Sequence, residues 1–192
     1  DYFDKVMSPF YLDLALTLKN KKSDEIKKSF EFFRKEVGNS IYEAPFANRV
    51  YHKPLGYAGD YEMMNIIYRQ EAEGKNLYAK CLHKYFIEKP AASAVRNRAT
   101  YLRGRIKEAI RNHKSDDPIR ILSVASGPAK EIQYFLKEEN IGDKKIEFHL
   151  IDQDMDSLKH AQRQLYTLAK HNKNIEFHFH NSAIKNIIAR GL

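Results

Sequence analysis

Three short stretches of the chain carry small or polar residues suited to binding a nucleotide-like ligand. The first is the turn Ala125-Ser-Gly-Pro-Ala129, the second contains Asp152, and the third contains Ser182 and Ala183. A turn of small residues lets a ligand approach the backbone closely, and a helix that follows it offers unpaired N–H groups. A carboxylate can accept hydrogen bonds from two hydroxyl groups at once, as on a ribose. Together these residues indicate a nucleoside-binding site.

Each of these stretches follows a predicted strand. Apolar runs predict strands at 119–124, 146–151 and 175–179, and helical periodicity predicts helices at 130–139, 156–170 and 184–189. Strands that alternate with helices in this way indicate a parallel sheet with right-handed crossovers. Asp152 then lies just past the carboxyl end of the second strand, where such folds hold ribose hydroxyls. The alternative role, a helix N-cap, suits Asp154 or Asp156, because Asp152 comes too early for it.

Residues 1–115 are predicted to be helical. Helical spacing of apolar residues predicts helices around 10–18, 26–37, 61–68 and 77–86 and a long helix from Pro90, with an irregular segment at 41–60 that holds two prolines and two glycines. The polar segment 113–118 ends in proline and marks a junction. We therefore predict an all-helical domain at 1–115, followed at 116–192 by the amino-terminal half of an α/β domain.

The turn after the first strand matches a dinucleotide-binding turn only weakly. That fingerprint needs G-x-G-x-x-G, and only Gly127 is present at a matching place. The chain instead resembles class I S-adenosylmethionine (SAM) methyltransferases, whose first motif is a strand, an acidic residue and then G-x-G-x-G. Ser123 replaces the acid, and Ala125 and Ala129 replace two of the glycines. At the end of the third strand, Ser182 occupies the position of another family acid.

Longer strings narrow this resemblance. They are His52-Lys-Pro-Leu-Gly-Tyr-Ala-Gly-Asp-Tyr-Glu-Met-Met64, Ser93-Ala-Val-Arg-Asn-Arg98 and Ser123-Val-Ala-Ser-Gly-Pro-Ala129. Over roughly residues 40–190 the chain resembles a bacterial branch of these methyltransferases. Named members of that branch make 3-hydroxy fatty acid methyl esters of the 3-hydroxypalmitate type. The resemblance implies a partial Rossmann-like SAM domain with the first three parallel strands, a preceding helical domain that covers its mouth, and O-methylation of a small hydrophobic carboxylic acid.

The resemblance also implies site residues. SAM is expected to contact Ala125, Ser126, Gly127, Pro128, Glu131, Asp152, Gln153, Ser182 and Ala183. An acidic acceptor needs a cationic anchor, for which the candidates are Arg96, Arg98 and His52, with Tyr57 and Asp60 from the same strings. The alternatives are that the arginines are solvated and that Tyr57 and Asp60 form a turn and an N-cap. No catalytic base is predicted, because a carboxylate acceptor is already ionised at pH 7.

Composition makes several classes of protein less favoured. The formal net charge is +8, but basic and acidic residues are interspersed, so a solvated surface is favoured over nucleic-acid binding. No apolar run is long enough to span a bilayer. The single cysteine, Cys81, cannot form an internal disulfide, which favours the reducing cytoplasm, and it is predicted to be a small core residue. His178 and His180 share one face of the third strand but have no third ligand near in sequence, so no metal site is expected.

A class I methyltransferase sheet has seven strands, and this chain supplies three. Either the natural chain continues beyond Leu192 or a second copy, in a homo-oligomer, covers the open edge. Alternative functions are methylation of another small molecule, a non-catalytic SAM or nucleotide sensor, and a basic nucleic-acid-binding module.

Overall fold

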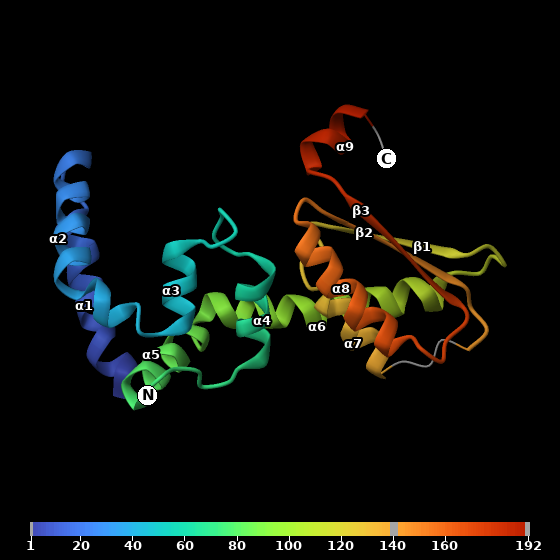
Figure 1. The fold of residues 1–192 in the computed structure, drawn as a ribbon, viewed down its shortest axis with the longest axis horizontal. Helices are drawn as coiled ribbons and strands as arrows, with labels where there is room; N and C mark the ends of the chain where they lie inside the picture. Colours follow the sequence, from blue (N-terminus) through green and yellow to red (C-terminus); the bar gives the residue numbers. More distant parts are fainter. Residues whose placement is uncertain (1, 139–141, 191–192) are drawn as a thin grey trace. The chain divides into compact units, whose positions relative to one another are not determined.

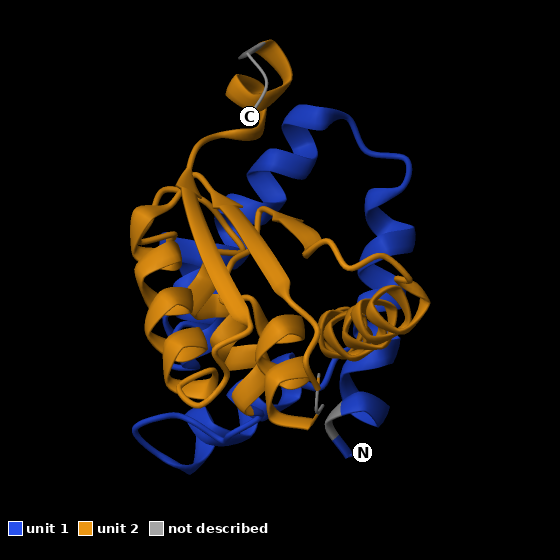
Figure 2. Cartoon of the chain, turned by 90° about the vertical axis from the view of Figure 1, so that its right-hand side faces the viewer, with its two compact units in different colours: residues 1–52, 70–89 blue, residues 53–69, 90–192 orange. Residues whose placement is uncertain are grey.

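The structure, a computed structural model, describes residues 2–138 and 142–190 (Figure 1). Within these ranges the elements are, in order, α1 (Tyr2–Leu18), α2 (Ser23–Ile41), α3 (Pro45–His52), α4 (Tyr61–Arg69), α5 (Leu77–Ile87), α6 (Pro90–Asn112), β1 (Ile119–Val124), α7 (Lys130–Glu138), β2 (Ile146–Asp152), α8 (Met155–Leu168), β3 (Ile175–Asn181) and α9 (Ile184–Arg190). Contacts divide the chain into two compact units, formed by residues 1–52 and 70–89 and by residues 53–69 and 90–192 (Figure 2).

The first unit is helical and contains α1, α2, α3 and α5. Its core includes Ala44, Leu82 and Tyr85, and α3 packs against α5. Asn76 begins α5 as an N-cap, because its side-chain oxygen accepts a hydrogen bond of 2.8 Å from the Ala79 N–H. None of the helices in the described ranges is long and apolar enough to cross a lipid bilayer.

The second unit is built on a parallel sheet in which β2 lies between β1 and β3. The register pairs Ile119 with Ile146 and Ile146 with Ile175, so the strands begin level and their carboxyl ends share one edge. This arrangement confirms the predicted parallel sheet. β2 and β3 run slightly farther than predicted, to Asp152 and Asn181, because these two residues still pair in register.

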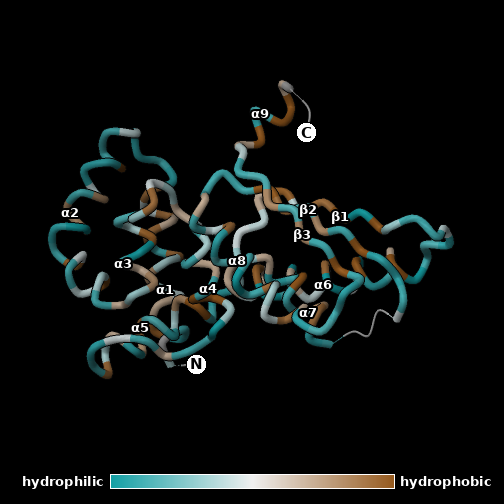
Figure 3. The backbone as a smooth tube through the Cα atoms, turned by 45° about the vertical axis from the view of Figure 1, so that its right-hand side comes forward, coloured by the Kyte–Doolittle hydropathy of each residue, from teal (hydrophilic) through white to brown (hydrophobic). Residues whose placement is uncertain are grey.

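Helices α6, α7 and α8 supply the residues that cover one face of the sheet (Figures 1 and 3). Successive residues of a strand point to opposite faces, so Phe148 and Leu150 share the covered face, where both are fully buried. They share one cluster with Ile106 from α6, Phe135 from α7 and Leu165 from α8. α6, which precedes β1, therefore shares one core with α7 and α8, which follow it.

Within the described residues, much of the opposite face of the sheet is open. Leu122 and Val124 on this face are 49% and 46% exposed, and polar side chains from all three strands lie beside them. That further chain or a second copy covers the open edge of the sheet stays a prediction.

The compact units do not follow the predicted division at residue 115. α4 and α6 belong to the unit of the sheet, because α6 packs along α7 and α4 packs on α6. The polar segment 113–118 marks the end of α6, but it does not separate two units, because α6 packs on the sheet that follows.

Two local predictions were wrong. Part of the segment predicted to be irregular forms α3, because Pro45 occupies the first helical position, where its missing N–H leaves no bond unmade. Cys81 is exposed rather than a core residue.

The predicted helix from Lys130 ends at Glu138, and its predicted last residue, Glu139, lies outside the described residues.

Candidate active site

A cavity of about 710 Å³ opens at the carboxyl ends of the three strands. Its lining comes from the second unit, and the volume lies in the range of small-molecule sites. Its wall includes every predicted cofactor-binding residue: Ala125, Ser126, Gly127, Pro128, Glu131, Asp152, Gln153, Ser182 and Ala183. The parallel sheet brings these residues together because each group follows one of its strands.

The turn between β1 and α7 has an unusual backbone. Ala125, Gly127 and Ala129 all have positive φ, at 53°, 52° and 52°. For a residue with a side chain, this conformation costs about 1–2 kcal/mol. A Cβ built on Gly127 would have no heavy atom within 4 Å, so the space beside it is open. The turn thus keeps a left-handed backbone at positions where two alanines replace glycine.

Asp152 holds this turn in place from the end of β2. Its Oδ2 accepts a hydrogen bond of 2.8 Å from the Gly127 N–H, and its Oδ1 accepts one of 3.0 Å from the Asp154 N–H. The Ser157 hydroxyl also donates to Oδ2, at 3.5 Å. Asp154, not Asp152, is the N-cap of α8, as the spacing predicted. Asp152 is buried, yet it still lines the cavity, and a carboxylate has lone pairs for further donors.

The third strand end is tied to the second. The Ser182 N–H donates to the Asp152 carbonyl oxygen at 3.0 Å, and the Asn181 side-chain amide donates to the carbonyls of Asp152 and Gln153 at 3.1 and 3.0 Å. These bonds place Ser182 and Ala183 on the same wall as the turn after β1. The three predicted stretches therefore form one connected surface.

Comparison with known proteins places this geometry in a family. Residues 55–181, about two thirds of the chain, match the sequence profile of a family described as "Putative methyltransferase". The chain belongs to this methyltransferase family. No curated protein and no solved structure matches it. The matched span contains α4, α6 and the three strands, which supply most of the cavity wall.

In this methyltransferase a carboxylate reaches the end of β1 from the next helix. Ser123, which stands where the resembled motif has an acid, donates a hydrogen bond of 3.1 Å to Glu131 Oε1 in the first turn of α7. Burial raises the pKa of Glu131, while the bond from Ser123 and the charge of Arg98 oppose that rise. A half-buried carboxylate on a cavity wall would be stabilised by a cationic group of a ligand.

The loop before α4 also reaches the cavity. Tyr57 and Gly59 line it, and the Tyr57 hydroxyl donates to Asp154 Oδ2 at 3.3 Å. Burial, together with the charges of Asp154 and Asp152, raises the pKa of Tyr57 to about 12. Tyr57 is therefore a neutral hydrogen-bond donor near pH 7 and not a base.

Of the two predicted arginines, only Arg98 lies on the cavity wall. Arg96 is not among the lining residues that the structure describes, and its guanidinium donates to Ser93 Oγ at 2.9 Å and to the Ile67 carbonyl at 3.5 Å. Arg96 and Arg98 are two residues apart on one helix, which rotates their side chains by about 200° around its axis. They therefore cannot both face one cavity.

The remaining predicted substrate residues lie elsewhere. His52 belongs to the first unit, at the end of α3, with its Nδ1 3.0 Å from the Asn48 carbonyl. Asp60 is buried, and its Oδ1 accepts a bond of 2.8 Å from the Met63 N–H, which makes it the cap of α4. Neither residue is among the described lining of the cavity.

Several lining residues were not predicted from the sequence. They are Gly59, Tyr61, Met64, Tyr68, Ala99, Leu102, Ser123, Val124, Lys130, Ser157, Ile184 and Lys185. The spacing of Tyr61, Met64 and Tyr68 could have revealed one of these groups, because residues three and four apart share a helix face. Burial lowers the pKa of Lys130, whose ammonium group lies 5.8 Å from the Tyr68 ring centre.

Proposed function

We propose that this chain is a SAM-dependent methyltransferase that converts a small hydrophobic carboxylic acid, of the 3-hydroxy fatty acid type, into its methyl ester. The observation that carries the proposal is the single cavity wall formed by three strand ends, with an open space beside Gly127 and a half-buried carboxylate, Glu131, on the same wall. Membership of a methyltransferase family supports the same chemistry.

The chain's residues suit SAM in two respects. Gly127 leaves the backbone open to close approach, and the first turn of α7 follows directly. SAM carries a sulfonium and an ammonium group, and Glu131 offers a carboxylate whose burial favours a positive partner. Asp152 and Gln153 would hold the ribose, and Ser182 and Ala183 would hold the adenine edge. When bound, SAM supplies an electrophilic methyl group.

The other part of the wall suits an acid with an apolar chain. Met64, Leu102 and Ile184 supply apolar surface, and Arg98 and Lys130 supply positive charge. A carboxylate acceptor is ionised at pH 7, so its oxygen can form the new O–C bond without a general base. The electron pair of the broken S–C bond stays on sulfur, and no proton is transferred. The chain must therefore align the two reactants and exclude water.

Arg98 and Arg96 provide a matched test of the acceptor site. Replacement of Arg98 with Met removes the proposed carboxylate anchor and should raise KM for 3-hydroxy fatty acids at least about tenfold, since a hydrogen bond to a charged group contributes about 1.5–3 kcal/mol. Arg96→Met on the same helix should leave KM unchanged. The assay is transfer of a labelled methyl group from SAM to a series of acids. Equal effects of the two substitutions would refute Arg98 as the anchor.

The alternative functions give different results in the same assay. Methyl transfer to a small molecule other than an acid would favour a methyltransferase with the same SAM site but a different acceptor. SAM binding without transfer to any acceptor would favour a sensor. In either case the proposal of ester formation would be wrong.

A further inference from the structure

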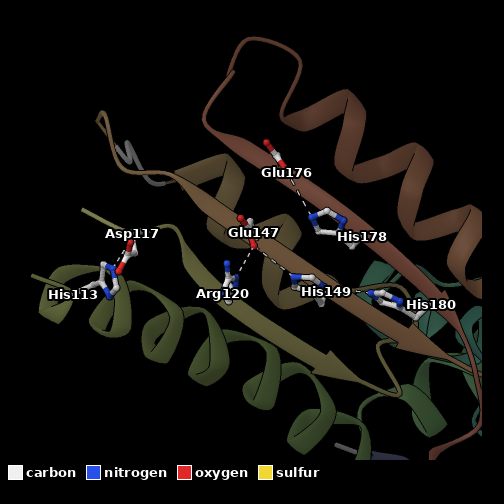
Figure 4. Close-up of polar contacts among 8 residues, drawn as sticks. All are labelled: His113, Asp117, Arg120, Glu147, His149, Glu176, His178 and His180. Atoms are coloured by element: carbon white, nitrogen blue, oxygen red, sulfur yellow. Dashed lines mark hydrogen bonds and ion pairs between the residues drawn. The ribbon is translucent and has the colours of Figure 1, made fainter. Parts of the chain in front are cut away.

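A second cluster of polar side chains lies on the open face of the sheet (Figure 4). It contains Glu147 and His149 on β2 and His178 on β3, none of which lines the cavity. Glu147 and His149 are alternate residues of one strand, and His149 is the register partner of His178, so all three point to the same face. The two imidazole rings are stacked, with centroids 4.5 Å apart and planes at 16°.

The spacing of these side chains suits a single small cation. One ligand atom from each residue lies within 4.8 Å of the others. An ion placed centrally would thus be at most about 2.8 Å from each atom, and small side-chain rotations would bring it to the usual Zn–N and Zn–O distances of about 2.0–2.2 Å. Strand pairing holds the backbones of all three residues, because Glu147, His149 and His178 all lie in the paired part of β2 and β3.

His149 carries a further sign of a missing partner. Its Nε2 is buried and has no hydrogen-bond partner among the described residues. The Glu147 Oε2 lies 3.8 Å from it, too far for a hydrogen bond but suitable for two atoms that share an ion. A buried polar atom without a partner is uncommon in a folded protein.

We propose that Glu147, His149 and His178 bind one divalent transition-metal ion, for which Zn²⁺ is the best match. Two imidazole nitrogens and one carboxylate oxygen are ligands that Zn²⁺ accepts, and a tetrahedral ion keeps its fourth position for water or another ligand. The ion joins β2 to β3 through their side chains.

The neighbours of the cluster support ligation by His149. Its Nδ1 lies 3.3 Å from His180 Nε2, so a metal on Nε2 would leave the Nδ1–H to donate to His180, which fixes the tautomer. Glu176 Oε2, 3.8 Å from His178 Nε2, adds a second nearby carboxylate.

Arg120 is the group that competes with the ion. Its Nε donates a hydrogen bond of 2.9 Å to Glu147 Oε2. The Arg120 side chain is 72% exposed, so it can swing into solvent when the carboxylate turns to an ion. Removal of its charge should therefore strengthen metal binding.

The test is a calorimetric titration of Zn²⁺ into the metal-free chain, in a Cys81→Ser background that removes the exposed thiol. We expect one ion per chain. His149→Ala and His178→Ala should each weaken binding at least about tenfold, whereas His171→Ala, an exposed histidine in the turn after α8, should not change it. Arg120→Met should strengthen binding, and Glu147→Gln should weaken it.

A second measurement covers variants that fold poorly. Zn²⁺ should raise the melting temperature of the parent chain and of His171→Ala, but not that of His178→Ala, whose side chain is partly exposed. The proposal is overturned if binding is not saturable at one ion per chain, or if the His149 and His178 variants bind Zn²⁺ as the parent does. Neither outcome depends on SAM or on methyl transfer.

Discussion

Replacement of Asp152 with Asn tests whether one carboxylate holds the turn that forms the candidate active site. The two oxygens of Asp152 accept hydrogen bonds from the N–H groups of Gly127 and Asp154, at 2.8 and 3.0 Å. An Asn side chain has a single acceptor oxygen, so its NH2 group would face one of these N–H groups. One backbone donor then loses its partner in a buried place.

The magnitude follows from those contacts. Loss of a hydrogen bond to a charged group destabilises by about 1.5–3 kcal/mol. For a unit of this size, 1 kcal/mol corresponds to roughly 4 °C in the melting temperature, so Asp152→Asn should lower it by about 6–12 °C. SAM binding should weaken as well, because the turn and the ribose contact would be disturbed together.

The assay is thermal unfolding followed by circular dichroism at pH 7, with Asp156→Asn as the matched control. Asp156 is an exposed acid in the first turn of α8, whose carboxylate lies 3.5 Å from Lys159 Nζ. Loss of an exposed ion pair changes stability by less than about 1 kcal/mol. If Asp152→Asn has the same melting temperature as the control and the parent chain, Asp152 does not hold the turn and the reasoning is refuted.

Three further predictions concern stability. Ala125→Gly should raise the free energy of unfolding by about 0.5–1 kcal/mol in urea titrations, because it relieves a positive φ at an exposed residue. Ala129→Gly should raise the free energy of unfolding by less, since it also removes a buried methyl group. Burial raises the folded-state pKa of Glu131 above 4.5, so its contribution to stability is present below pH 4.5 and should decline as pH rises through the folded-state pKa. Glu131→Gln should therefore flatten the decline of the melting temperature with pH. A variant with the same pH profile as the parent chain would contradict this prediction. Asn76→Ala should lower the free energy of unfolding of the first unit by about 1 kcal/mol through loss of its N-cap, detected as faster amide exchange in α5.

The parallel sheet and the wall of the cavity could be predicted because both depend on local patterns. Apolar runs fixed the strands, and each polar stretch followed one of them, so a parallel sheet had to gather the stretches at one edge. The replacement of glycines by Ala125 and Ala129 was visible, but their positive φ was not, because the sequence does not state how much strain a turn tolerates.

Other features depend on rotation and register, which periodicity fixes poorly. Arg96 and Arg98 were treated alike although a helix turns them to different sides, and only Arg98 lines the cavity. The bond from Ser123 to Glu131 joins a strand to the helix after it, so the carboxylate near the strand end could not be found by motif position alone. The sequence showed no third potential ligand near His178, because the other residues of the proposed metal site lie on β2 and become its neighbours only through strand pairing.

The central claim is that the cavity beside Gly127 binds SAM, and calorimetric titration of SAM into the chain tests it most directly. We predict saturable binding at one molecule per chain, weakened about tenfold or more by Glu131→Gln and unchanged by Arg96→Met. Absence of saturable binding, or equal affinity in the Glu131→Gln variant, would contradict the account.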